Sequence, residues 1–354
     1  PQQYKQLLMV SGFDKYFQIA PCFRDEDARA DRSPGEFYQL DFEMSFATQE
    51  DVFRVGEEVL TATFEKFAPE GSVVTAAPYP VISYKQAMLE FGSDKPDLRN
   101  PLRIVDVTDF FQRCTFKPFH GQTVRAIKVS NKMSKGFHEK LLKFATSIGM
   151  GGLGYLEVKE DLSYKGPIDK FIPDDMKAEI REIASLKAGD TIFFIADKEK
   201  QAALYAGQLR NELGQRLDLL EKNAYRFCFI NDFPMYEYDE EQKKIIFTHN
   251  PFSMPQGGLE ALTTKDPLEL LAYQYDIVCN GVELSSGAVR NHNLDIMVKA
   301  FEIAGYTEED LKEKFGALYN AFQYGAPPHA GMAPGVDRMI MLLRNEENIR
   351  EVIP

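Results

Sequence analysis

Cysteine is scarce in this 354-residue sequence, and none of it shows paired spacing. The four cysteines stand singly among apolar residues, at Cys22, Cys114, Cys228 and Cys279. A disulfide framework or a structural zinc site needs cysteines at close, repeated spacings. We therefore expect four buried free thiols, which are typical of the reducing cytoplasm.

Long apolar runs and an excess of basic residues are also lacking. The chain has no apolar run of the roughly 18 residues that a membrane helix needs, and no secretory segment. Its 41 lysines and arginines are outnumbered by 54 aspartates and glutamates, which gives a formal net charge of −13. This balance argues against a protein that coats nucleic acid electrostatically, but it does not exclude a large acidic enzyme with a local basic track.

Near the N-terminus, two stretches that alternate apolar and polar residues flank a long polar loop. Period-two alternation on both sides predicts two antiparallel strands with one apolar and one polar face. The apolar face carries Phe17, Ile19, Pro21, Phe23, Tyr38, Leu40 and Phe42, and the polar face carries Arg24, Phe37, Gln39, Asp41 and Glu43. Such a polar face ordinarily meets water. Because this one combines a fixed cation with two carboxylates beside an unusually long loop, we predict that it binds a zwitterion and a phosphate.

A second hairpin is predicted around Asn280-Gly281, which favours a two-residue type I′ turn between apolar runs. That turn pairs residue 279 with 282, 278 with 283 and 276 with 285, so Asp276 and Glu283 share a face. Two carboxylates at such a short distance repel each other unless a cation lies between them. Mg²⁺ with substrate phosphates fits such a pair, and an acidic surface pair is the alternative.

Near the C-terminus, glycine-rich residues 325–335 lead into a short helix. We expect Val336, Met339, Ile340 and Leu343 to bury one face of that helix. Arg338 lies in the first turn, where a cation opposes the helix dipole. This position is poor for stability but suits a phosphate ligand.

Between these regions, residues 102–222 show a different sequence pattern. Strand-like runs at 124–129, 154–158 and 191–196 alternate with helical runs at 138–148, 174–185 and 198–213. The alternation predicts an inserted α/β domain with its own core. We therefore divide the chain into residues 1–101, 102–222 and 223–354, with the first and last parts forming one domain.

These stretches together resemble the class II aminoacyl-tRNA synthetases, in particular the bacterial-type aspartyl-tRNA synthetases. Residues 23–43 are similar to motif 2 and residues 325–343 to motif 3, and residues 102–222 resemble the GAD insert. The octapeptide Gly-Ser-Asp-Lys-Pro-Asp-Leu-Arg at 92–99 is a marker of the bacterial type, although its residues suggest no role by themselves. The fold implied is α+β, with an antiparallel sheet flanked by helices and interrupted by the insert. Motif 1, which builds a homodimer in this class, and an OB-fold are expected upstream of Pro1.

The resemblance implies a cytoplasmic ligase that forms a carbon–oxygen bond. It would activate L-aspartate with ATP and Mg²⁺, then transfer aspartate to the 3′ end of tRNA-Asp, with tRNA-Asn open as a second acceptor. An aspartate–ammonia ligase on the same fold, or a non-catalytic paralogue acting as a binding module, are the alternatives.

The resemblance also implies a role for individual residues. Arg24 and Arg338 are the expected catalytic residues. Aspartate is expected to contact Gln2, Lys5, Arg24, Gln39, Asp41, His249 and Arg290. ATP is expected to contact Arg24, Asp25, Glu26, Ser33, Phe37, Glu283, Gly335, Val336, Asp337 and Arg338. Mg²⁺ is expected at Asp276 and Glu283. Asn250 stands where bacterial relatives often carry a second histidine after His249.

Overall fold

The computed structural model describes residues 2–25, 30, 32, 35–130 and 133–353. The chain forms two compact units. Unit 1 comprises Pro1–Tyr84 and Asn223–Pro354, and unit 2 comprises Lys85–Lys222. The sequence-based division placed the first boundary after residue 101, whereas residues 85–101 cluster with unit 2. None of the helices in the described part of the chain has the length and apolar character needed to cross a bilayer.

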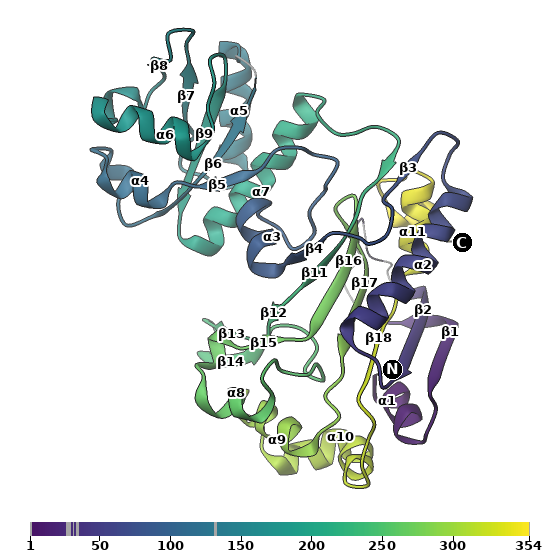
Figure 1. Cartoon of the computed structure of the whole chain (residues 1–354). Coiled ribbons are helices and arrows are strands. Elements are labelled where there is room, and N and C mark those ends of the chain that lie inside the picture. The colour runs from purple at the N-terminus through teal and green to yellow at the C-terminus, as the bar shows by residue number, and fades with distance from the viewer. Residues whose placement is uncertain (1, 26–29, 31, 33–34, 131–132, 354) are drawn as a thin grey trace. The chain divides into compact units, whose positions relative to one another are not determined.

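A seven-stranded sheet forms the centre of unit 1 (Figure 1). Its strands lie in the order β1 (Lys15–Phe23), β2 (Glu36–Ser45), β18 (His329–Met332), β17 (Val282–Val289), β16 (Gln274–Cys279), β11 (Phe227–Asn231) and β4 (Val81–Ser83). All neighbours pair antiparallel except β11 and β4, which are parallel. The predicted antiparallel sheet with flanking helices is confirmed.

Helices flank this sheet, and short strand pairs complete the unit. The helices are α1 (Gln2–Val10), α2 (Gln49–Phe67), α8 (Gly258–Thr264), α9 (Leu294–Ile303), α10 (Glu308–Phe322) and α11 (Val336–Leu343). The short strands are β3 (Val73–Val74), β10 (Ala224–Tyr225), β12 (Phe233–Pro234), β13 (Tyr236–Asp239), β14 (Lys244–Phe247) and β15 (Leu271–Ala272). Thr48 begins α2 with a capping box to Asp51. Phe53 of this helix stacks on Phe229 of the sheet at a centroid distance of 3.8 Å.

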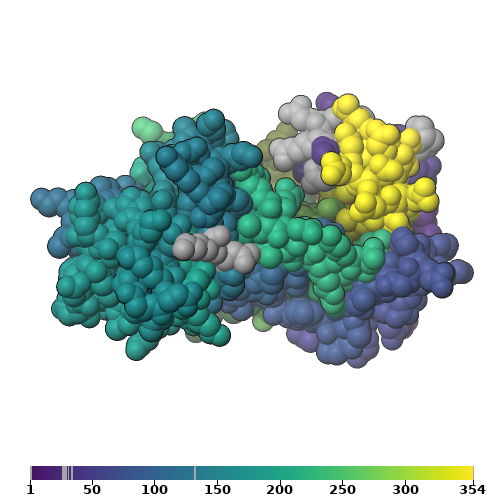
Figure 2. Space-filling model, turned by 90° about the horizontal axis from the view of Figure 1, so that it is seen from above, coloured from purple at the N-terminus to yellow at the C-terminus, as the bar shows by residue number. Residues whose placement is uncertain are grey.

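The C-terminal helix α11 closes the core of unit 1. Leu342 and Leu343 pack with Ala68 and Val74 against the buried side chains under α2. Figure 2 accordingly shows the C-terminal residues, in yellow, at the surface beside the blue segment that holds the end of α2 and β3. The predicted buried face of α11 is partly wrong, because Ile340 is 39% exposed while Asp337 and Met341 are buried.

The hairpin of β1 and β2 has the two predicted faces, and its apolar face is largely uncovered at the edge of the sheet. Phe17 pairs with Phe42 and Ile19 with Leu40, so these side chains share one face. On edge strand β1, however, Phe17 is 73%, Ile19 66% and Phe23 73% exposed. Contiguous exposed apolar side chains are typical of a surface that another protein segment covers.

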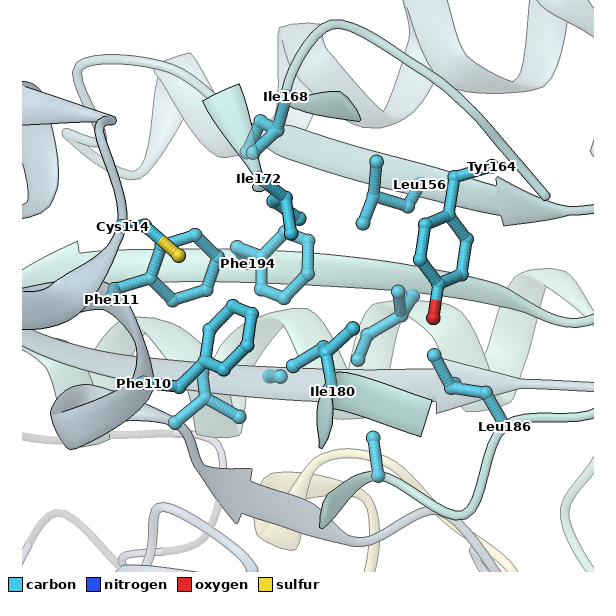
Figure 3. Packing of buried hydrophobic residues seen from close by; sticks show 14 of the residues in the cluster. Phe110, Phe111, Cys114, Leu156, Tyr164, Ile168, Ile172, Ile180, Leu186 and Phe194 are labelled. Atoms are coloured by element: carbon cyan, nitrogen blue, oxygen red, sulfur yellow. The ribbon is translucent and has the colours of Figure 1, made fainter. Parts of the chain in front are cut away.

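Unit 2 contains a second sheet with a hydrophobic core on each face. The strands lie in the order β5 (Ile104–Asp106), β6 (Thr123–Val129), β9 (Thr191–Asp197), β7 (Gly154–Val158) and β8 (Tyr164–Lys165), and all neighbours are antiparallel. Its helices are α3 (Tyr84–Glu90), α4 (Thr108–Arg113), α5 (Lys135–Ser147), α6 (Lys177–Ile183) and α7 (Glu199–Arg216). Phe194 points into the core that Figure 3 shows, with Phe111 and Ile180, while its neighbour Phe193 packs in the opposite core. The predicted alternation of strands and helices around a separate core is confirmed, but the expected α/β class is wrong, because all strand pairs of this sheet are antiparallel.

The octapeptide at residues 92–99 is held on α7 by a buried arginine. Arg210 is only 1% exposed, and its guanidinium donates to the carbonyls of Asp97, Asn100 and Leu102 at 2.7–3.0 Å. A Cβ on Gly92 or Gly207 would meet backbone of the opposite segment at 2.5 Å or less, so both positions require glycine. This close approach gives the loop a structural role within unit 2 that its sequence did not suggest.

We expect Arg210→Met to destabilise unit 2 by roughly 3 kcal/mol, because buried carbonyls would lose their donors. For a unit of this size, this corresponds to a fall in Tm of roughly 6–12 °C. Arg216→Met is the matched control, because Arg216 lies on the same helix but pairs with Glu212 near the surface. Thermal unfolding of both variants tests this, and equal melting temperatures would contradict the role of Arg210.

Candidate active site

A cavity of about 700 Å³ opens over the polar face of the unit 1 sheet. The predicted site residues that line it are Gln2, Lys5, Arg24, Phe37, Gln39, Asp41, Glu283, Arg290, Gly335, Asp337 and Arg338. Asp25, Val336, His249 and Asp276 are not among its lining residues, and Glu26 and Ser33 lie outside the described residues. The fold therefore brings together most of a set that the sequence spreads over more than 330 positions.

The register of the sheet arranges the floor of the cavity in rows. Opposed residues of neighbouring strands share a face, so Gln274, Ala288, Gly331 and Glu43 form one row across β16, β17, β18 and β2. Asp276 and Ser286 pair in the row on one side of it, and Arg290 follows Ala288 on the other side. One end of the floor thus carries carboxylates, and the other carries a guanidinium.

At the end of the floor that carries Arg290, two buried cations contact the same buried carboxylate. Lys5 Nζ lies 3.1 Å from Asp41 Oδ1 and 3.2 Å from Glu43 Oε1. Arg290 donates to the same Glu43 oxygen from Nε and Nη2, at 2.9 and 2.6 Å. Burial alone would raise the pKa of Glu43, but Arg290 and Lys5 outweigh it and hold that pKa below its ordinary value. Glu43 is therefore ionised and fixes both cations.

A buried hydrogen-bond chain that the sequence did not reveal supports this network. Gln6 Nε2 lies 3.2 Å from His329 Nε2 and donates to the carbonyl of Asn291. His329 Nδ1 lies 2.9 Å from the carbonyl of Pro327, which can only accept. His329 therefore carries its proton on Nδ1, and burial lowers its pKa. The chain ties α1, which carries Lys5, to strand β18.

The opposite end of the cavity is built from motif 2 and motif 3 residues. Arg24 lies over the Phe37 ring, 5.1 Å from its centroid. Arg338 Nη1 donates to the carbonyl of Glu283 at 2.6 Å. The carboxylate of Asp337 accepts from the backbone N–H of Tyr38 at 2.7 Å and ties α11 to β2. Its expected contact with ATP stays a prediction.

The thiol expected to be buried at position 22 also borders this cavity. Cys114, Cys228 and Cys279 are buried and free, as predicted. Cys22 is free but half-buried, because it alternates onto the polar face of β1. Its pKa is raised by burial, although Arg24 opposes the shift.

The predicted metal pair converges on a serine hydroxyl. The Asn280-Gly281 turn pairs 279 with 282 and 278 with 283 as predicted, but a β-bulge then sets Asp276 opposite Ser286 instead of residue 285. Ser286 Oγ lies 2.5 Å from Asp276 Oδ1 and 3.2 Å from Glu283 Oε1. Both carboxylates therefore do lie on one face, with Ser286 between them.

These residues fit a magnesium ion that draws further ligands from a substrate. Mg²⁺ is usually held by one or two carboxylates together with substrate phosphates and water. Among the described residues, no group of three or more histidine, cysteine, aspartate or glutamate side chains could hold a metal by itself. Glu283 lines the cavity and can contribute a carboxylate, whereas Asp276 is buried and accepts from Ser286 in this conformation. Phosphate oxygens would have to complete the coordination.

The loop after β14 presents asparagine, not histidine, to the cavity. The His249 ring packs edge-on against Phe233 at a centroid distance of 4.9 Å. The next residue, Asn250, lines the cavity and donates to Gln2 Oε1 at 3.4 Å. Asn250 is therefore the polar side chain that links this loop to α1 in this conformation.

Acidification is expected to destabilise the protein through His329. Burial lowers the folded-state pKa, so below about pH 6.5 the unfolded chain takes up a proton that the folded chain refuses. The contribution of His329 to the free energy of unfolding is fully present above that pH, and it is lost as the pH falls toward the folded-state pKa. Urea unfolding between pH 7.5 and 5.5 should show a shallower loss for His329→Asn than for the wild type. His249→Asn is the control, and equal slopes for wild type and His329→Asn would refute the assignment.

Comparison with known proteins covers the whole chain. The family model described as tRNA synthetases class II (D, K and N) matches residues 1–354. The chain is 60% identical to the aspartate–tRNA(Asp/Asn) ligase of Gluconobacter oxydans (strain 621H) over 360 residues, which is 100% of this chain and 60% of that protein. It is 59% identical, with the same coverage, to the aspartate–tRNA(Asp/Asn) ligase of Zymomonas mobilis subsp. mobilis.

A solved structure, the aspartyl tRNA synthetase from Entamoeba histolytica, gives a TM-score of 0.48 at 16% identity over 100% of this chain and 50% of that chain. The chain spans about 60% of the length of the curated relatives it matches. The full-length family match and the identity to these relatives agree with the motif residues gathered around the cavity. This chain therefore belongs to the class II tRNA synthetases of the aspartate, lysine and asparagine group.

Proposed function

We propose that the chain is the catalytic region of an enzyme that joins L-aspartate to tRNA-Asp through an aspartyl-adenylate. The main observation behind this proposal is that Lys5 and Arg290 both pair with Glu43. Lys5 also pairs with Asp41, and the same cavity holds Arg24 and Phe37. Two cations beside a carboxylate suit an amino acid with an ammonium and a second carboxylate. A cation over an aromatic ring suits a nucleotide.

In the first step, the α-carboxylate of aspartate attacks the α-phosphorus of ATP. A carbon-bound oxygen forms the new bond to phosphorus, the bond to pyrophosphate breaks, and pyrophosphate leaves. Asp41 receives the substrate ammonium, Lys5 and Arg290 receive the distal carboxylate, and Arg24 with Gln39 faces the reacting groups. No enzyme nucleophile is required, so positioning and charge stabilisation provide the rate enhancement.

The remaining groups orient the nucleotide. Phe37 stacks on the adenine, and Arg338 neutralises phosphate charge at the N-terminus of α11. Asp276 and Glu283 would hold Mg²⁺, which offsets phosphate charge when bound. In the second step, a hydroxyl of the 3′-terminal ribose of tRNA attacks the aspartyl carbonyl, and AMP leaves.

The acceptor, assembly and location extend this proposal. The named relatives are aspartate–tRNA(Asp/Asn) ligases, which supports tRNA-Asn as a second acceptor here. Exposed Phe17, Ile19 and Phe23 on β1 support a homodimer in which another protein segment covers this face. Four unpaired thiols support a cytoplasmic location. Unit 2 corresponds in sequence position to the GAD insert.

Two assays separate this function from its alternatives. Aspartate-dependent exchange of pyrophosphate with ATP would exclude a non-catalytic binding module. Aspartate-dependent charging of purified tRNA-Asp and tRNA-Asn would exclude an aspartate–ammonia ligase, which forms asparagine from ammonia instead. Exchange without charging of either tRNA, together with asparagine formation, would overturn the proposal.

Arg24→Ala should lower the exchange rate by roughly 10²- to 10³-fold, because one preorganised charge contact in a transition state contributes about 3–4 kcal/mol. The fold should persist, since Arg24 is exposed at the end of β1. Arg54→Ala is the matched control, because Arg54 is exposed on α2 and pairs with Asp51. Exchange by a folded Arg24→Ala variant at the rate of Arg54→Ala would remove Arg24 from the catalytic residues.

Glu283→Gln should shift the exchange reaction to higher Mg²⁺ concentration, since a neutral amide is a weaker magnesium ligand than a carboxylate. The measurement is the exchange rate as a function of total Mg²⁺ at fixed ATP. Glu58→Gln, an exposed change on α2, should keep the wild-type midpoint. If Glu283→Gln keeps that midpoint too, the pair of carboxylates does not bind the metal.

A further inference from the structure

Gln274 is a buried polar residue of the cavity for which neither the motifs nor the reaction gives a role. It is 5% exposed and lines the cavity. Its carboxamide makes no hydrogen bond to any other residue that the structure describes. Because these polar atoms are not sealed from solvent, they open onto the cavity, and a polar group that enters it can form hydrogen bonds with them.

The register places Gln274 between the two ends of the cavity floor. Gln274 pairs with Ala288 in its row, one step from the row of Asp276 and Ser286. Arg290 follows two residues after Ala288, roughly 7 Å along β17. Gln274 thus lies on β16, beside the end of the cavity that carries Arg290. Lys5 reaches the same end from α1.

The rest of the row of Gln274 lies beneath the cavity lining. Its row continues through Ala288 to Gly331. A Cβ on Gly331 would meet the carboxyl carbon of Glu43 at 2.5 Å, so the Glu43 carboxylate already lies over that glycine. Ala288 is 0% exposed, so Gln274 and Arg290, and not Ala288, border the open cavity in this part of the sheet.

We propose that Gln274 is a substrate-binding residue that donates its Nε2–H to the distal carboxylate of aspartate. This inference rests on the proposed function and adds a third, neutral donor to Lys5 and Arg290. A carboxamide presents either a donor or an acceptor when it rotates by half a turn. Gln274 therefore also satisfies the amide of asparagine, so it adds affinity for both amino acids and leaves charge selection to the two cations.

This division of roles predicts different effects for two substitutions. Gln274→Met keeps the side-chain length but removes the donor, and should weaken aspartate binding by roughly 10- to 100-fold, as for a hydrogen bond to a charged group. The preference for aspartate over asparagine should stay within about tenfold of the wild type. Lys5→Met removes a cation and should lower the same preference by more than about 100-fold.

Gln274→Glu gives the sharper test. A carboxylate at this position would repel the distal carboxylate of aspartate but accept from the amide of asparagine. We expect it to move the preference toward asparagine by a larger factor than Gln274→Met does. A purely structural role for Gln274 would lower the affinity for both amino acids alike.

The measurements are the Kd values of L-aspartate and L-asparagine by calorimetry and KM values for aspartate and ATP in pyrophosphate exchange. Thermal unfolding checks that each variant is folded, and Gln242→Met, at the exposed tip between β13 and β14, is the control. A raised aspartate KM with an unchanged ATP KM supports the proposal. A wild-type aspartate Kd in folded Gln274→Met, or an equal rise in both KM values, overturns it.

The two levels of the proposal fail separately. If the wild type neither binds aspartate nor exchanges pyrophosphate, the proposed function itself is wrong. If the wild type activates aspartate and Gln274→Met matches it, only the role of Gln274 is wrong. Should Gln274→Met not fold, Gln274→Asn, which shortens the side chain by one methylene, provides the same comparison.

Discussion

The end of the cavity that carries Lys5 and Arg290 depends on one buried carboxylate, that of Glu43. It lies over Gly331, accepts both hydrogen bonds from Arg290 and pairs with Lys5, so it joins β2, β18, α1 and the residue that follows β17 at one point. A buried ion network is weak support for stability, because desolvation offsets much of the Coulomb attraction. Its stronger effect is on position. Since Arg290 and Lys5 hold the pKa of Glu43 below its ordinary value, the carboxylate stays charged and keeps both cations in place.

This pairing changes the physical account of amino-acid choice. Lys5 and Arg290 are already neutralised by Asp41 and Glu43 before any substrate binds, so the proposed preference for aspartate over asparagine cannot depend on cations that lack a counter-ion. In the proposed complex, the substrate ammonium takes Asp41, which frees Lys5 to pair with the distal carboxylate. Recognition of the ammonium and of the distal carboxylate would then be coupled through Lys5. Asparagine offers the ammonium but only a neutral group for the released cation, and that missing charge pair would be the source of the proposed selectivity.

Local patterns predicted the faces of the site but not the contacts between its strands. Period-two alternation correctly assigned Gln39 and Asp41 to the cavity face of β2, and Asn280-Gly281 correctly fixed the start of its hairpin. The bulge that brings Ser286 between the carboxylates leaves no local signal of comparable strength. Gln6 and His329 were missed because their hydrogen-bond partners lie far away in the sequence. Gln274 was missed because only the cavity, which distant segments of the chain enclose, suggests a role for it. Ile340 was predicted to be buried because an apolar residue at helical spacing does not reveal which neighbours exist to cover it.

The position of unit 2 in the chain also follows from strand pairing. Strand β4 lies beside β11 in parallel, whereas the other strands of the sheet pair antiparallel. A tight turn can join antiparallel neighbours, but parallel neighbours need a crossover of a dozen residues or more. The chain between β4 and β11 must therefore be long in any case, and here it contains the whole of unit 2. All described residues that line the cavity belong to unit 1. A connection that has to leave the sheet and return can thus hold a separately packed unit without displacing any side chain of the site.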